Sequence, residues 1–132
     1  MCQLWIDIDD SVDLVGLSRS SDQALRQMAV FDAVVNNADR KIGHLLPSTD
    51  GHLYGCDHGV CFSADYKLRT VLWQWRGKRL PGRAAAALQH LSETLADGGE
   101  LAATRNRVDL LIEHKVHPYP PADWPAVPWP PI

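Results

Sequence analysis

Long runs of a single residue class are missing from this 132-residue sequence, and each absence argues against a class of protein. No apolar stretch approaches the roughly 18 residues of a membrane-spanning helix. No more than two basic residues are adjacent and the formal net charge is -3, which disfavours nucleic-acid binding. The first ten residues, MCQLWIDIDD, are acidic where a signal peptide is basic. We therefore expect a soluble, cytoplasmic protein with neither a membrane span nor a nucleic-acid partner.

Cysteine is also scarce, whereas proline is concentrated near the end of the chain. The three cysteines form no disulfide framework, which fits a reducing compartment. The length suits one hydrophobic core and no repeat is visible, so we expect a single domain over residues 1–132. Residues 118–132 hold seven of the nine prolines and two tryptophans. Because exposed tryptophans are costly, we expect this tail to dock onto the chain's own core.

The hydrophobic pattern predicts an α+β domain that is mostly helical and carries one small β-hairpin. The expected segments are a strand and acidic loop over 1–19, a helix over 20–36, a loop and hairpin over 37–62, a packed segment and helical hairpin over 63–117, and the tail over 118–132. Ser20 and Gln23 form a capping-box pattern at the start of the first helix.

Three further details of these elements can be tested against the structure. The apolar stripe of the first helix is expected to consist of Leu25, Met28, Phe31 and Val35. Asp50-Gly51 gives the strongest hairpin-turn signal, between strands that begin near Leu45 and Leu53. The two later helices, over 83–97 and 100–115 with Gly98-Gly99 between them, are expected to cover the hairpin.

Acidic residues stand at both ends of the predicted hairpin. Asp39 follows the first helix, His44 lies five residues later, and Asp57 follows the return strand. A hairpin can bring these three positions to one edge. Phosphoryl transfer needs one carboxylate to orient the attacking hydroxyl and another to hold the metal at the phosphates. The plainer alternatives are that Asp39 pairs with Arg40 or caps a turn, and that His44 is hydrogen-bonded inside the loop.

Two short motifs in this stretch resemble those of a known superfamily. Asp39-Arg40-Lys41-Ile42-Gly43-His44 resembles the D-R-x-x-x-N catalytic loop of phosphatidylinositol 3-/4-kinase-like enzymes, and Asp57-His58-Gly59 resembles their D-x-G metal-binding element. The segments VVNNADRK, YGCDHGVCF, LRTVLWQW and WPAVPWPP are similar to a bacterial family of uncharacterised phosphatidylinositol 3-/4-kinase-like proteins. The resemblance covers nearly the whole chain.

The resemblance implies the C-terminal lobe of a protein- or lipid-kinase-like fold, without the N-terminal lobe. It implies ATP with Mg or Mn as cofactor and a hydroxyl-bearing acceptor as substrate. Asp39 and Lys41 are expected to be catalytic, Arg40 and Lys41 to contact the nucleotide, and His44 and Asp57 to bind the metal. His44 stands where the superfamily has asparagine, and imidazole favours softer ions such as Mn over Mg. Arg40 is expected to be either this phosphate contact or a structural clamp.

The implied lobe leaves several outcomes open. Without an N-terminal lobe the chain is expected to turn over slowly or not at all, and an uncovered apolar face would favour a homo-oligomer or an N-terminal partner. One alternative is a non-catalytic pseudokinase module that binds a nucleotide or a partner. Another is a small zinc-binding domain, with candidate ligands His44, His52, Cys56, Asp57, His58 and Cys61. Their spacing matches no structural zinc motif, and the two cysteines are more simply read as small core residues.

Overall fold

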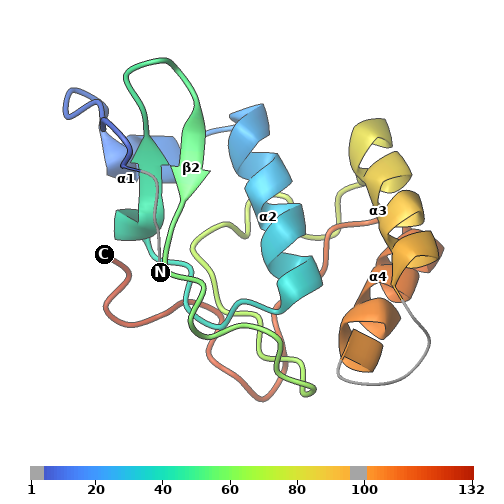
Figure 1. The fold of residues 1–132 in the computed structure, drawn as a ribbon. Coiled ribbons are helices and arrows are strands. Elements are labelled where there is room, and N and C mark those ends of the chain that lie inside the picture. The colour runs from blue at the N-terminus through green and yellow to red at the C-terminus, as the bar shows by residue number, and fades with distance from the viewer. Residues whose placement is uncertain (1–4, 96–100) are drawn as a thin grey trace.

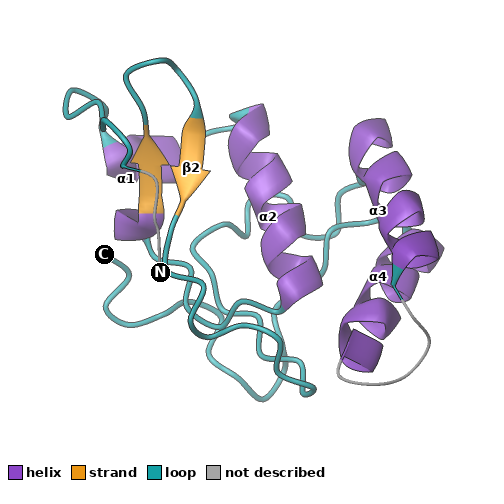
Figure 2. Cartoon of the chain, viewed as in Figure 1, coloured by secondary structure: helices purple, strands orange, loops and turns teal. Residues whose placement is uncertain are grey.

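The computed structural model describes residues 5–95 and 101–132. Within them it contains four α-helices, one short 3-10 helix and a two-stranded antiparallel sheet (Figures 1 and 2), so the α+β prediction is confirmed. The elements are α1 (Leu14–Ser18), α2 (Gln23–Val35), η1 (Ile42–His44), β1 (Leu45–Pro47), β2 (Leu53–Gly55), α3 (Gly82–Thr94) and α4 (Ala102–His114). None of the described helices has the length and apolar character needed to cross a membrane.

Helix α2 confirms the predicted first helix but begins later than the capping-box pattern indicated. Asp22, not Ser20, is the N-cap, and its Oδ1 accepts a hydrogen bond from the Ala24 N–H at 2.8 Å. Ser20 instead accepts from the Asp22 N–H at 3.3 Å. At the other end Asn36 takes the left-handed conformation with φ 57°, which turns the chain sharply out of the helix. This exit places the following loop beside the hairpin.

Both sides of α2 are buried, which makes it the centre of the domain. Val30 and Val34 pack with residues of α3 and α4 in one cluster, whereas Leu25 and Ala29 pack with Leu45 of the hairpin in another. Figure 1 shows α2 between the hairpin and the α3–α4 pair. The single apolar stripe predicted for this helix therefore covers less of its surface than is buried. Phe31, one of the four predicted stripe residues, is 47% exposed.

The same arrangement corrects the expected position of the later helices. Helices α3 and α4 contact each other, and α4 also contacts α2. They lie on the side of α2 opposite the hairpin (Figure 1), so they do not cover it. The hairpin itself is confirmed, with Leu45 opposite Gly55 and Pro47 opposite Leu53. Its turn contains Gly51 at φ 86°, as the Asp-Gly signal indicated. The Gly98-Gly99 stop signal lies outside the described residues.

The predicted N-terminal strand is wrong for the part of it that the structure describes. Over residues 5–13 the only strand-like pairing is an isolated bridge between Ile8 and Ser48. The extended backbone ends immediately afterwards because Asp9 Oδ1 accepts from both the N–H and the hydroxyl of Ser11, at 3.0 and 2.6 Å. The chain then enters α1, a short helix that the sequence pattern did not indicate.

The proline-rich tail docks onto the domain through part of its length, as predicted, but Trp129 is 87% exposed, contrary to the expectation that its tryptophans would be covered. The Ala126 carbonyl accepts from the Thr70 N–H at 3.0 Å and from the Trp73 indole N–H at 2.7 Å. The Pro131 carbonyl accepts from the Ile42 N–H at 2.8 Å. Leu72 and Trp75 of the adjoining segment are buried, as expected for the predicted packed segment. The tail is thus hydrogen-bonded to η1 and to the segment that contains Thr70 and Trp73.

His117 makes the stability of this fold depend on pH. Its side chain is buried, and its Nε2 accepts from Arg26 Nε at 3.1 Å. Burial, and then the Arg26 charge, lower the pKa of His117 from 6.5 to about 4. The unfolded chain therefore binds a proton between these two values that the folded chain does not bind. The stability associated with neutral His117 is complete above pH 6.5 and is lost as pH falls toward 4.

We expect the free energy of unfolding to fall by roughly 2 to 3 kcal/mol between pH 7 and pH 4 through this group alone. The measurement is urea denaturation across this range for the wild-type chain and for His117→Gln, which cannot take up the proton. The variant should lose less stability than the wild type over the same range. Equal losses in the two proteins would contradict the assignment.

Candidate metal centre

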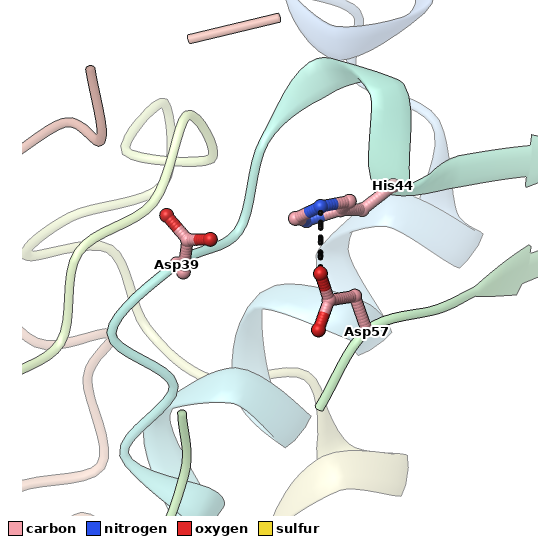
Figure 3. A group of neighbouring side chains, drawn as sticks. All are labelled: Asp39, His44 and Asp57. Carbon is pink, nitrogen blue, oxygen red and sulfur yellow. Dashed lines mark ion pairs between the residues drawn. The ribbon is translucent and has the colours of Figure 1, made fainter. Parts of the chain in front are cut away.

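Three chain segments converge at the open end of the hairpin. Asp39 lies in the loop after α2, His44 closes η1, and Asp57 follows β2. One ligand atom from each lies within 4.8 Å of the others, and Figure 3 shows the three side chains facing a common space. The sequence-based expectation that the hairpin brings these residues to one edge is confirmed. His44 and Asp39 are partly buried, whereas the Asp57 side chain is 55% exposed.

Asp57 has a backbone conformation that few residues adopt without an external constraint. Its φ is 60°, in the left-handed region, whereas the nearby Gly59 has no such φ. Aspartate tolerates this region better than most residues, yet positive φ in a non-glycine residue is concentrated at functional sites. The unusual backbone conformation is therefore that of the acidic residue itself and not of a neighbouring glycine.

The hydrogen bonds of His44 define which ring nitrogen carries its proton. Nδ1 accepts from the Lys41 N–H at 3.2 Å, and the Lys41 carbonyl accepts from the His44 N–H at 3.2 Å. A neutral ring that accepts at Nδ1 carries its proton on Nε2, which lies 3.4 Å from Asp57 Oδ2. In this arrangement His44 orients Asp57. Ligation of a metal by Nε2 requires that proton to move to Nδ1, which would end the bond that Nδ1 accepts from the Lys41 N–H.

Asp39 is held by two partners that sequence reasoning did not assign to the site. Its N–H donates to Asn37 Oδ1 at 3.0 Å, and its Oδ1 lies 3.5 Å from Arg69 Nη2. Arg69 is fixed in turn by donation from Nε to the Ala38 carbonyl at 2.7 Å. The sequence predicts only a packed segment around Arg69, which is rich in tryptophan, and gives no sign that Arg69 belongs to the site. Arg69 places a cation beside Asp39.

Of its two expected roles, Arg40 has that of a structural clamp. Burial of its side chain opposes the other role, contact with a phosphate. Its side chain is fully buried and donates to both carboxylate oxygens of Asp32, at 2.9 and 2.8 Å. The strength of this pairing outweighs what burial alone would do, and the pKa of Arg40 is raised. Lys41 is partly buried, and its backbone N–H bonds to His44. Of the two predicted nucleotide contacts, only Lys41 retains an accessible side chain.

The six residues proposed as zinc ligands are not gathered as a set. Among the described residues, the only group of metal-binding type is Asp39, His44 and Asp57, and it contains no cysteine. Burial raises the pKa of the Cys56 and Cys61 thiols, which disfavours the thiolate form that zinc requires. The His58 ring lies 3.0 Å from Arg40 Nη2, and burial together with that charge lowers its pKa. Cys61 instead packs against the core, and the Cys56 carbonyl and the His58 ring contact Arg40.

The fold and this site define a small α+β chain with a candidate divalent-metal centre built from two carboxylates and one imidazole. No family model matches the chain, and no solved structure does. The chain is similar to Protein Rv2133c of Mycobacterium tuberculosis (strain ATCC 25618 / H37Rv), with 41% identity over 133 residues. The match covers 92% of this chain and 48% of that protein, so the chain spans about half the length of the curated relative.

We expect Mn²⁺ to bind this centre with one ion per chain, with the His44 imidazole as one ligand. The change His44→Asn replaces that imidazole with an amide, an oxygen ligand. It should raise the affinity for Mg²⁺ relative to Mn²⁺. Competitive Mn²⁺ and Mg²⁺ titrations followed by electron paramagnetic resonance measure both constants. The matched control is His52→Asn, which changes an exposed histidine outside the group. An unchanged ion preference in His44→Asn would exclude His44 as a ligand.

Proposed function

We propose that this chain is the catalytic-loop half of a phosphatidylinositol 3-/4-kinase-like phosphotransferase, related to the C-terminal lobe of kinases. It would bind a metal complex of ATP and transfer the γ-phosphoryl group to a hydroxyl acceptor. The observation that carries the proposal is the convergence of Asp39, His44 and Asp57 from a loop, a turn and a strand end. Their order along the chain, helix, acidic loop, hairpin and second acidic residue, is the order of the motifs that the sequence resembles.

In this function the two carboxylates have different roles. Asp39, whose side chain is 23% exposed beside Arg69, would accept or orient the proton of the attacking hydroxyl. Asp57 is the more exposed of the two and would bind Mg or Mn against the nucleotide phosphates. His44 would complete the metal site or hold Asp57 in position. In the second arrangement only carboxylate oxygens bind the metal, which suits Mg²⁺, whereas a His44 nitrogen ligand suits Mn²⁺.

Cations near the carboxylates would supply the remaining charge that phosphoryl transfer needs. Lys41 is adjacent in sequence to the clamp and partly accessible, so it is the proposed phosphate contact from the catalytic loop. Arg69, already 3.5 Å from Asp39, would exchange this partner for a phosphate oxygen when the carboxylate takes its catalytic role. Arg40 has no such freedom because its guanidinium is buried against Asp32.

A non-catalytic nucleotide- or partner-binding module is the second candidate. The observation that favours it is that each acidic side chain already has a partner within the chain, Asp39 with Arg69 and Asp57 with His44. Such internal pairing gives each carboxylate a partner without a metal. A module of this kind would bind ATP equally well with and without divalent ions, whereas a phosphotransferase site requires them.

We expect ATP to bind the chain in calorimetric titrations only when Mg²⁺ or Mn²⁺ is present, and Asp57→Ala to weaken that binding by a factor of ten or more, since it removes a metal ligand. The matched control is Asp65→Ala, which removes an exposed carboxylate outside the metal group. It should bind ATP as the wild type does.

Metal-independent ATP binding that survives in Asp57→Ala would contradict the phosphotransferase proposal and support the non-catalytic module. Absence of binding in the wild type, with or without metal, would contradict both. Retention of metal-dependent binding in Asp57→Ala would show that the nucleotide site lies elsewhere in the chain.

A further inference from the structure

Asp32, which sequence analysis treated only as part of a helix, occupies an unusual position for a carboxylate. It lies in the last turn of α2 and its side chain is fully buried. The negative end of the helix dipole and the loss of hydration both oppose a charged carboxylate there. The cost is offset by Arg40, whose Nε and Nη2 donate to Oδ2 and Oδ1 in a bidentate pair.

The Arg40 guanidinium extends this pair to both neighbours of Asp57. Nη1 donates to the Cys56 carbonyl at 3.1 Å, and Nη2 lies 3.0 Å from His58 Nε2. Asp57 stands between these two contacts, in its left-handed conformation. The orientation of the guanidinium plane, which Asp32 sets, therefore fixes the chain on each side of the exposed acidic residue.

A second path leads from the same carboxylate to Asp39. Asp32 Oδ1 also accepts from Asn37 Nδ2 at 3.1 Å, and Asn37 Oδ1 accepts from the Asp39 N–H at 3.0 Å. Asp32 Oδ1 is thus linked through Arg40 to the backbone beside Asp57, and through Asn37 to the backbone of Asp39. Displacement of Asp32 would move Asp39 and Asp57 relative to each other.

We propose that Asp32, acting through Arg40 and Asn37, is the positioning residue of the metal centre. The inference rests on the proposed function, since it requires that the centre bind a metal. A buried ion pair gives little net stability compared with apolar residues of similar volume, so stability alone does not account for this one. Hydrogen-bonded partners behind metal ligands, in contrast, commonly determine metal affinity.

The packing around the guanidinium agrees with a requirement for its exact placement. Gly55 ends strand β2 directly against Arg40. A Cβ at this position would lie 3.0 Å from Arg40 Nη1 and 3.2 Å from Met28 Cε. An alanine there would push on the guanidinium without removing either charge, which provides a second and milder way to disturb the network.

The test is an electron paramagnetic resonance titration of Mn²⁺ alone into the wild type, Asp32→Asn, and the double variant Asp32→Leu/Arg40→Met, with urea denaturation of each. We expect Mn²⁺ affinity to fall about 10- to 100-fold in both variants. The double variant, which replaces both charges by apolar groups, should recover stability that Asp32→Asn loses, but not affinity. The control Val108→Ala makes a cavity in the remote α4 core and should lose stability while keeping its Mn²⁺ affinity.

Two results would overturn the inference in distinguishable ways. Absence of Mn²⁺ binding by the wild type would remove the metal centre itself, and the proposed metal-dependent function with it. Binding by the wild type that stays within about twofold in Asp32→Asn or in the folded double variant would remove only the positioning role. If neither of these variants folds, Gly55→Ala decides, because it should fold and bind Mn²⁺ several-fold more weakly, and wild-type affinity in that variant would refute the role.

Discussion

The buried pair of Asp32 and Arg40 is the interaction on which the candidate site depends. The loops that carry Asp39 and Asp57 have little regular secondary structure, and single backbone hydrogen bonds join them, such as that from the Ala38 N–H to the Val60 carbonyl at 2.9 Å. Arg40 adds side-chain contacts to the residues around Asp57, while its backbone N–H and carbonyl pair with Arg69 and Val71. One residue thereby joins helix α2, the hairpin end and the following segment. The geometry of the centre therefore depends on charge pairing in the core as well as on strand pairing in the hairpin.

Helix α2 gives that pair its surroundings. Because apolar residues cover both of its sides, the helix separates a core with α3 and α4 from a smaller core beneath the hairpin. The ion pair and Asn37 are buried at the C-terminal end of the helix, where the chain turns back through Asn36. The low dielectric of this region strengthens the pairing and makes any unpaired partner costly. The acidic side chains of the site remain nearer to solvent, where they can meet a metal.

Local signals allowed a substantial part of this structure to be predicted from sequence. Asp50-Gly51 located the hairpin, and the polar residues after Val35 located the helix end, so the convergence of residues 39, 44 and 57 followed from chain geometry. Interactions across the fold could not be predicted in the same way. No local pattern distinguishes a buried Asp32 from an exposed helical aspartate, and Arg69 reaches Asp39 only because the intervening chain folds back. The placement of α3 and α4 likewise depends on a second apolar face of α2.

The tail completes the argument, because it contacts both η1 and the segment that contains Arg69. Its Pro131 carbonyl receives the Ile42 N–H within η1, and its Ala126 carbonyl receives the N–H of Thr70, the residue after Arg69. Lys67 and Arg69 lie over the ring of Trp124, at 4.0 and 5.4 Å from its centroid. Such stacking restrains a guanidinium while leaving its charge available. Arg69 is thereby held near Asp39 by a weak and exchangeable contact, whereas Arg40 is locked by a bidentate one, and this difference suits the first to meet a ligand and the second to position the site.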